Sequence, residues 1–383
     1  MSTKTNTVID IHNVVSPEEI SKIINDSLDK IEKDPSMSEA LPPILIRGVP
    51  GCGKSSIVRE ICKNRGIEFI DIRLSQLEPC DIMGLPVPNK EKKSMEWYVN
   101  GRWPRNKDGK GIIFLDELTA ADKSIQVAAY QLILDRCLGD LYQVPSGYLI
   151  VAAGNQTTDR AVATTMSSAL ANRFLHFTLK PDSEQWCNWG LSHNIHPAVM
   201  GFIRYKPALL FSMDDDQNLE MGWPTPRSWE RVSTMTHIYN NDENILRKIV
   251  YGLVGNGAGV EYMEFFKLNQ EFDNILEYML SSDKVIKIPE KSDRRYALVS
   301  AMIYHLWRGE DDDSTNRRIN GFFRICMELD SAFATMAMMS AMQGNDRISS
   351  DKACETLFHH PMYKDWSTKH GSALRRRTKI DIS

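Results

Sequence analysis

Gly48-Val-Pro-Gly-Cys-Gly-Lys54-Ser55 is the stretch of sequence that decides the fold. It follows the apolar run Ile44 to Ile46 and precedes a helical stretch, so it predicts a glycine-rich turn between a strand and a helix. Glycines let the backbone curl so that successive N–H groups face an anion, and the helix amino terminus adds partial positive charge. The lysine and serine after the third glycine supply a cation for phosphate oxygens and a hydroxyl for Mg²⁺. The stretch therefore predicts a phosphate-binding loop.

A second motif, Gly111-Ile-Ile-Phe-Leu-Asp116-Glu117, is an apolar strand that ends in two carboxylates. In a parallel sheet, such a strand delivers both acids to the same edge as the phosphate loop. Asp116 is predicted to hold Mg²⁺ through its water shell, and Glu117 to polarise the attacking water. An apolar run followed by Asp-Glu is, taken alone, most simply a strand leaving the core; its pairing with the loop favours the catalytic interpretation.

Three further polar residues are candidates for the same site. Asn155 follows the apolar strand that begins at Tyr148 and offers a neutral amide to a water and the γ-phosphate. Arg173 directly precedes a strand, and Arg227 opens a helix in the second half of the chain. A guanidinium suits the charge that develops on a transferring phosphoryl group.

The predicted site residues thus fall into three groups by role. The residues predicted to act in catalysis are Glu117, Asn155, Arg173 and Arg227. The residues predicted to hold the nucleotide are Gly48, Pro50, Gly51, Cys52, Gly53, Lys54, Ser55, Ser56 and Asp116. The predicted ligands of Mg²⁺ are Ser55 and Asp116.

Short apolar runs alternate with helical stretches in the first half of the chain, which predicts an α/β fold with a mainly parallel five-stranded sheet flanked by helices. The predicted strands are 44–46, 67–74, 112–115, 148–153 and 174–179. From about residue 183, helical periodicity dominates, as in 301–307 and 325–342. The predicted domains are an N-terminal helical segment (1–40), an α/β nucleotide-binding core (41–182), an α-helical lid (183–290) and a C-terminal helical region with a basic tail (291–383).

The composition indicates an ordinary soluble protein. Hydrophobic residues make up 42% and charged residues 25% of the chain, and no apolar run reaches the roughly 20 residues needed to span a bilayer. The start of the chain lacks the features of a signal peptide, so we predict a cytoplasmic protein with no membrane partner. The net charge of −4 gives no general attraction for nucleic acid. Seven scattered cysteines without a C-x-x-C pair argue against disulfides or a zinc site.

With these motifs in hand, the chain resembles the AAA+ ATPases, and most of all their MoxR branch, over residues 40–270. The resemblance rests on GVPGCGKS, IIFLDE, AAGN, ALANRF and PTPR, which stand in the family's order. It implies that Asn155 is sensor 1, that Arg173 is the finger inserted into the neighbouring subunit's site, and that Arg227 is sensor 2. It also implies a homo-oligomeric ring, usually a hexamer, with ATP at the subunit interfaces. Arg160 is an alternative finger, and whether Arg227 acts in cis or in trans stays open.

Two segments within the core also resemble the MoxR branch. Residues 85–109 resemble its helix-2 insert, and about 138–148 resemble the hairpin that precedes sensor 1. In the insert, Trp97, Tyr98 and Trp103 are interleaved with basic residues. In the family, both segments protrude and engage the client; ordinary exposed loops with a basic face are the alternative.

We weigh three functions. The first is a ring ATPase that uses ATP and Mg²⁺ to remodel or activate a protein client, in this family often a von Willebrand factor A domain protein. The second is a nucleic-acid motor or loader in which bases stack on Trp97 or Trp103; the negative net charge favours the first over it. The third, a small-molecule kinase, is disfavoured because such enzymes use acceptor pockets and mobile lids instead of a sensor asparagine and paired arginines.

Overall fold

The computed structural model describes residues 13–139, 142–155, 166–213 and 222–380. Contacts between Cα atoms divide the chain into two compact units, Met1–Pro181 and Asp182–Ser383. The predicted N-terminal segment and, except for Asp182, the α/β core fall within the first unit, and the predicted lid and C-terminal region fall within the second. Arg160, the alternative finger, lies outside the described residues.

The first unit is built on a six-stranded sheet in the order β1-β10-β2-β9-β6-β3, in which every neighbouring pair is parallel. Its strands are β1 (Val14–Val15), β2 (Ile44–Arg47), β3 (Glu68–Arg73), β6 (Gly111–Asp116), β9 (Tyr148–Gly154) and β10 (Leu175–Leu179). The predicted fold class is confirmed, and all five predicted strands are present. The predicted number of strands is wrong by one, because β1 pairs with β10 at the edge of the sheet. A two-residue strand is too short to show an alternating pattern in the sequence.

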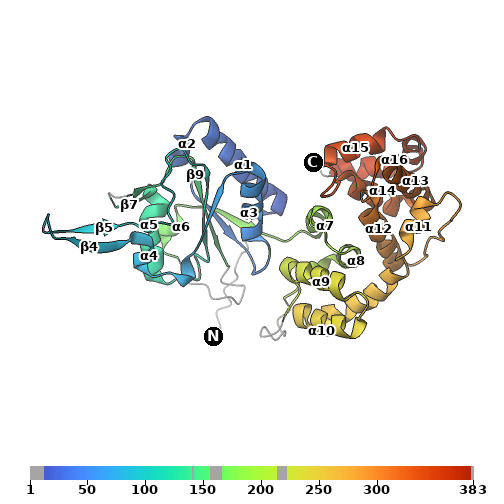
Figure 1. The fold of residues 1–383 in the computed structure, drawn as a ribbon, viewed down its shortest axis with the longest axis horizontal. Helices are drawn as coiled ribbons and strands as arrows, with labels where there is room; N and C mark the ends of the chain where they lie inside the picture. Colours follow the sequence, from blue (N-terminus) through green and yellow to red (C-terminus); the bar gives the residue numbers. More distant parts are fainter. Residues whose placement is uncertain (1–12, 140–141, 156–165, 214–221, 381–383) are drawn as a thin grey trace, which may run out of the picture. The chain divides into compact units, whose positions relative to one another are not determined.

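Helices cover both faces of this sheet (Figure 1). Successive strand residues point to opposite faces. Ile44 and Ile46 therefore join the core beneath α1 and α3, whereas Leu45 joins the core beneath α4, α5 and α6. The helices of the first unit are α1 (Pro17–Lys33), α2 (Met37–Ala40), α3 (Lys54–Arg65), η2 (Leu74–Gln76), α4 (Pro79–Met83), α5 (Lys123–Asp135) and α6 (Ser168–Ala171).

Helix α1 begins at Pro17, directly after a side-chain cap. Ser16 is the N-cap, its hydroxyl accepts from the Glu19 amide, and the Glu19 carboxylate accepts from the Ser16 amide. This reciprocal pair is the capping box, which satisfies two amides that the helix leaves unpaired.

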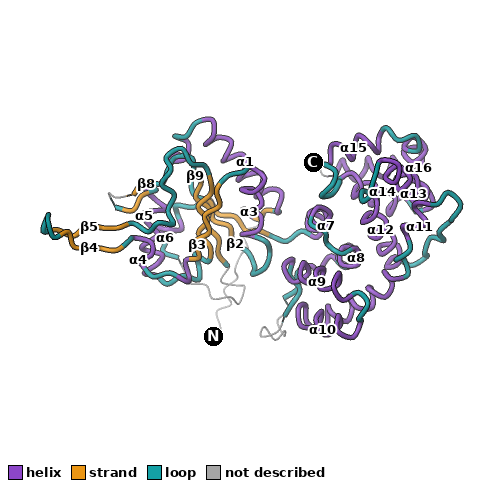
Figure 2. The backbone as a smooth tube through the Cα atoms, in the orientation of Figure 1, coloured by secondary structure: helices purple, strands orange, loops and turns teal. Residues whose placement is uncertain are grey.

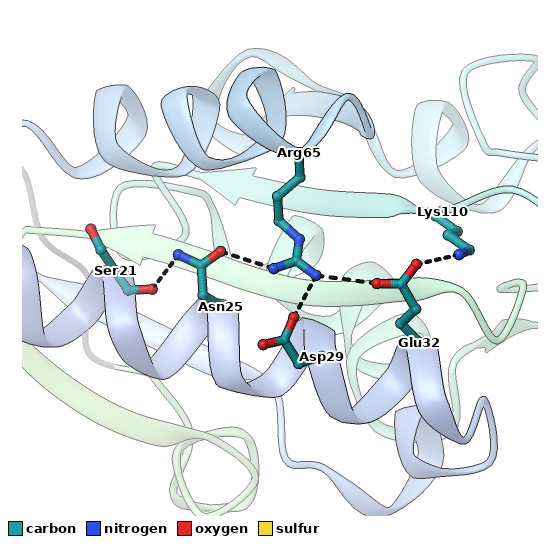
Figure 3. Close-up of polar contacts among 6 residues, drawn as sticks. All are labelled: Ser21, Asn25, Asp29, Glu32, Arg65 and Lys110. Carbon is teal, nitrogen blue, oxygen red and sulfur yellow. Dashed lines mark hydrogen bonds and ion pairs between the residues drawn. The ribbon is translucent and has the colours of Figure 1, made fainter. Parts of the chain in front are cut away.

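A polar network fixes α1 to the carboxyl end of α3 (Figure 3). Arg65 on α3 donates to Asn25 at 3.2 Å and to Asp29 at 2.6 Å, and its guanidinium lies 3.4 Å from Glu32. Lys110, directly before β6, donates to the same Glu32 at 2.6 Å. Exposed ion pairs contribute little one by one, but this network joins the two helices to the strand that carries Asp116.

Two antiparallel hairpins are inserted into the first unit. The longer pairs β4 (Leu85–Asn89) with β5 (Ser94–Tyr98) and extends from the sheet (Figure 1). The shorter pairs β7 (Cys137–Leu138) with β8 (Tyr142–Gln143). Trp103 was a candidate platform for base stacking, and that prediction is wrong. Its side chain is 1% exposed, and its indole N–H donates to the Ile82 carbonyl at 3.2 Å.

In the second unit, the described residues form helices joined by loops (Figure 2). The elements are α7 (Ser183–Ser192), α8 (Pro197–Tyr205), η3 (Pro207–Leu210), α9 (Pro226–Tyr239), α10 (Glu243–Gln270), α11 (Ile275–Leu280), α12 (Ser292–Leu306), α13 (Asp312–Glu328), α14 (Ser331–Met342), α15 (Ser350–Phe358) and α16 (Tyr363–Ile380). One apolar core runs from Trp186 to Trp366, so the predicted lid and C-terminal region share it. The predicted helical stretch 325–342 is interrupted at Leu329–Asp330, where the Asp330 side chain caps α14.

No helix in the described part of the chain combines the length and the apolar character needed to cross a membrane.

Buried histidines in the second unit predict a loss of stability in acid. Burial, and then the charge of His237, lower the pKa of His196 to about 3, and burial lowers that of His305 to about 4. Unfolding exposes both side chains, whose pKa then returns to about 6.5. As the pH falls below that value, the unfolded chain binds protons that the folded chain does not. Each histidine therefore lowers the free energy of unfolding by about 1.4 kcal/mol per pH unit until its folded pKa is reached.

His196→Asn tests this expectation. His196 Nδ1 accepts from the Ala198 amide at 3.1 Å and caps α8, and asparagine keeps an N-cap acceptor without titrating. Urea unfolding at about pH 7 and about pH 5 should show that the variant loses about 2 kcal/mol less than the wild type between the two conditions. Equal losses in the two proteins would contradict the assignment.

Candidate nucleotide site

The phosphate loop has the backbone that its glycines predict. Gly51 and Gly53 adopt positive φ angles of 80° and 99°, a region that other residues enter only with strain. At Gly48 the constraint is space, because an added Cβ would lie 2.9 Å from the Leu179 carbonyl oxygen and 3.0 Å from Cys52 Sγ. The loop between β2 and α3 thus depends on glycine at each of these three positions.

Helix α3 begins at Lys54, so Ser55 and Ser56 lie in its first turn. The first amides of a helix have no acceptor within it and face outward with the positive end of the helix dipole. Lys54 Nζ donates to the Gly48 carbonyl oxygen and, at 3.2 Å each, to Val49 O and Asn155 Oδ1. The lysine therefore folds back over the loop, and its ammonium group is held by neutral oxygens that phosphate oxygens can replace.

Asn155 lies beside the lysine because of the strand order. Strand β9 stands between β2 and β6, so the residue that follows β9 lies between the phosphate loop and the two acids. The backbone of Asn155 is held on both sides by Thr119. Its N–H donates to Thr119 Oγ1 at 2.9 Å, and its carbonyl accepts from the same hydroxyl at 3.2 Å. Sequence reasoning did not predict this role of Thr119, since nothing local distinguishes it.

Asp116 ends β6 at the same edge of the sheet. It pairs across the ladder with Arg73 of β3, and α3 packs against both strands. Burial, together with the nearby charges of Asp71 and Glu117, raises the pKa of Asp116, while the Glu117 amide and Lys54 oppose the rise. Burial makes the Asp116 carboxylate costly to ionise, and a cation bound beside it would offset that cost. Asp116 is therefore suited to bind a metal ion.

Glu117 adopts an unusual backbone conformation. Its φ is +58°, which is uncommon for a residue other than glycine and concentrates at functional sites. Its amide donates to Asp116 Oδ1 at 2.9 Å, and its carboxylate accepts from the hydroxyl of Ser75 in η2, just after β3. Ser75 was not predicted from the sequence, because it lies 42 residues away in a stretch with no motif.

Of the predicted arginines, Arg173 does not join this group within one chain. Arg173 is exposed and lines a pocket with Pro43 and Leu149, which lie at the amino ends of β2 and β9. The phosphate loop lies at the opposite edge. Strand β9 has seven residues, which span about 20 Å at roughly 3.3 Å per residue. Arg227 is exposed on α9 of the second unit, so its position relative to the loop is not defined.

The residues present fit ATP and Mg²⁺. The loop and the first turn of α3 offer backbone amides, the ammonium group of Lys54 and a serine hydroxyl, and the end of β6 offers Asp116. Among the described residues, no three His, Cys, Asp or Glu side chains gather into a cluster that could hold a metal. The Ser55 hydroxyl and the Asp116 carboxylate suit Mg²⁺, which keeps several waters and binds through one or two protein oxygens together with substrate phosphates.

The family model of the viral superfamily 1 RNA helicase core domain matches residues 44–172, which contain the loop, Asp116, Glu117 and Asn155. Among solved structures, a predicted ATPase from Cytophaga hutchinsonii is 13% identical, with coverage of 89% of this chain and 85% of that chain and a TM-score of 0.28. RuvB of Thermotoga maritima is similar in two structures. One, of a variant of RuvB, is 11% identical with a TM-score of 0.33, and the other, of the Holliday junction branch migration motor, is 12% identical with a TM-score of 0.32. Each covers 90% of both chains. TM-scores this low support no conclusion about fold or function.

The geometry and the family-model match define the class. Residues 44–172 form a P-loop domain of the kind that binds and hydrolyses nucleoside triphosphates.

Proposed function

We propose that this chain is an AAA+ ATPase of the MoxR type that hydrolyses ATP with Mg²⁺ and uses the energy to remodel or activate a protein client. The observation that carries the ATPase assignment is the convergence of three separate segments. Lys54 of the loop contacts Asn155 after β9. Asp116 ends β6, the strand beside β9, and Glu117 follows it directly.

Each residue then has a task in hydrolysis. Lys54 exchanges its carbonyl partners for β- and γ-phosphate oxygens, and Ser55 and Asp116 hold Mg²⁺. When bound, the metal ion neutralises charge that develops on the phosphate oxygens. Glu117 takes a proton from the attacking water, and Asn155 orients that water and the γ-phosphate. The Ser75 hydroxyl donates to Oε2 of Glu117, and the carboxylate has a second oxygen that can take the proton from the water.

The place of Arg173 supports a site completed by a second subunit. An exposed arginine at the opposite edge of the sheet from its own loop is poorly placed to serve that loop, but a head-to-tail neighbour can bring it to the next one. A closed ring, with six subunits in the family that the motifs resemble, satisfies this requirement for every subunit. Arg227 serves as sensor 2 in cis or in trans.

A nucleic-acid motor is the second candidate, because the matching family model describes an RNA helicase core. The burial of Trp103 removes one of the two stacking platforms on which that function would depend. Single-stranded RNA or DNA that stimulates ATP hydrolysis, with an effect that weakens steeply as salt rises, would favour this candidate over a protein client.

Lys54→Ala is the test of ATPase function. Wild-type protein should release phosphate from ATP only when Mg²⁺ is present, and the variant should neither bind ATP measurably nor hydrolyse it, since it lacks the cation of the loop. Lys63→Ala, at the far end of α3, is the matched control and should retain the wild-type rate. Phosphate release by Lys54→Ala at the wild-type rate would refute the assignment.

A further inference from the structure

The second unit contains a pocket that is built entirely from its own helices. The pocket has a volume of about 210 Å³ and is lined by residues of α7, α8, η3, α12 and α14. Pockets for drug-sized ligands measure roughly 300–1,000 Å³. This pocket therefore suits a smaller ligand, of about the size of an amino acid or a short organic acid.

Helix α14 forms one wall of the pocket. Its lining residues stand at positions i, i+3, i+4 and i+7, which lie on one face of a helix. They are Met336, Met339, Ser340 and Gln343. The wall therefore combines two apolar side chains with two that can form hydrogen bonds.

Arg204, near the end of α8, gives the pocket a positive charge that has no carboxylate partner. Its side chain lines the pocket, and among the described residues it forms no ion pair, while its Nη1 is buried without a hydrogen-bond partner. A guanidinium group stays charged in proteins, and a buried donor without an acceptor is destabilising. A ligand with a carboxylate would neutralise this charge and could accept two parallel hydrogen bonds.

Four neutral polar side chains around Arg204 are also without a protein partner. Ser183, Asn188, Ser340 and Gln343 line the pocket, and the described part of the chain supplies no hydrogen bond to any of these side chains. Ser340 is only 5% exposed, and a buried hydroxyl usually has a partner. Together these side chains provide both donors and acceptors for a polar ligand.

Glu184 gives the pocket a negative charge as well. It lies on α7, four residues before Asn188, and lines the same pocket with an exposed side chain. No ion pair between Glu184 and Arg204 is present in the described residues. The two opposite charges are therefore both available to a ligand, and a simple anion could use only one of them.

We propose that this pocket binds a small zwitterion, an α-amino acid with an apolar side chain. Its carboxylate pairs with Arg204 and its ammonium group with Glu184, while its side chain packs on Met336 and Met339 of the α14 wall. A free carboxylate or inorganic phosphate shares only the contact with Arg204. The pocket lies within the second unit, so the proposal does not depend on ATP hydrolysis.

Isothermal titration calorimetry on the full chain, without nucleotide, tests the proposal. The probes are L-leucine, 4-methylpentanoate, which has the same carbon skeleton without the ammonium group, and inorganic phosphate. Leucine should saturate one site per chain and bind more tightly than either of the other two. An absence of binding by leucine at millimolar concentration, or tighter binding by phosphate, would overturn the proposal.

Two variants locate the binding in this pocket. Arg204→Met should weaken leucine binding about tenfold or more, because it removes the charged donor. Glu184→Gln should abolish the preference for leucine over 4-methylpentanoate, and its melting temperature should match that of the wild type because the side chain is exposed.

Arg231→Met is the matched control, since Arg231 is an exposed arginine of α9 that does not line the pocket. It should bind leucine as the wild type does. Leucine binding by Arg204→Met that equals this control, or an undiminished preference for leucine in Glu184→Gln, would contradict the assignment. Because no ATP is present, these results are independent of the ATPase assignment.

Discussion

Replacing Glu117 by glutamine is expected to lower the rate of ATP hydrolysis by about 10²–10⁴-fold while ATP binding persists. Glutamine keeps the size and hydrogen-bonding capacity of the side chain but cannot take a proton from water. The positive φ of Glu117 holds its side chain at the edge of the sheet beside Asp116, and glutamine can occupy the same position. Steady-state phosphate release and equilibrium binding of a fluorescent ATP analogue measure the two properties separately.

A matched variant distinguishes loss of the base from general damage. Glu60→Gln makes the same chemical change on α3 and should leave both properties as in the wild type. If Glu117→Gln hydrolyses ATP at the wild-type rate, Glu117 is not the base. If it loses ATP binding as well, the residue acts mainly in holding the site together.

Arg173→Ala is expected to lower hydrolysis by about 10³–10⁵-fold, the range measured for arginines that reach a phosphoryl group from a partner. Arg173 lies at the opposite edge of the sheet from its own loop, so we expect it to contact the phosphoryl group bound in the site of a neighbouring subunit. ATP binding should change far less, because the arginine acts on charge that develops during the reaction. The rate per subunit of the wild type should also fall on dilution, as neighbours separate.

Mixing experiments decide whether the arginine acts between subunits. Arg173→Ala supplies an intact phosphate loop, and Lys54→Ala supplies an intact Arg173. A mixture of the two inactive proteins should recover measurable hydrolysis if a site is completed by its neighbour. A mixture that stays as inactive as either protein alone, while subunit exchange is demonstrated by fluorescence energy transfer, would show that Arg173 is not required in trans.

Much of the site could be predicted because its residues stand in short contiguous motifs. The loop, the acids after β6 and Asn155 each follow a strand, and parallel strands bring their carboxyl ends to one edge. The same rule places a residue that precedes a strand at the other edge, as is found for Arg173. The cap of α1 was predictable as well, since Ser16 and Glu19 stand at the required spacing.

Other features were not predictable, for physical reasons. Strand β1 has only two residues, so no period reveals it. The contact between Ser75 and Glu117 and that between Thr119 and Asn155 join residues 42 and 36 positions apart, and either hydroxyl would suit a surface loop equally well. Trp103 lies among basic residues, which indicates exposure, but its indole fits the core beneath α4. In each case the place of the residue depends on tertiary packing, which the local sequence does not reveal.

The central claim is that Ser55 and Asp116 hold one Mg²⁺ beside a triphosphate held by Lys54. Calorimetric titration with ATP, in Mg²⁺ and then in excess EDTA, tests it most directly. Wild-type protein should bind ATP more tightly in Mg²⁺, and Ser55→Ala and Asp116→Asn should each reduce that advantage by roughly 10–100-fold in metal affinity while ATP binding in EDTA stays unchanged. An undiminished Mg²⁺ advantage in both variants would contradict the account.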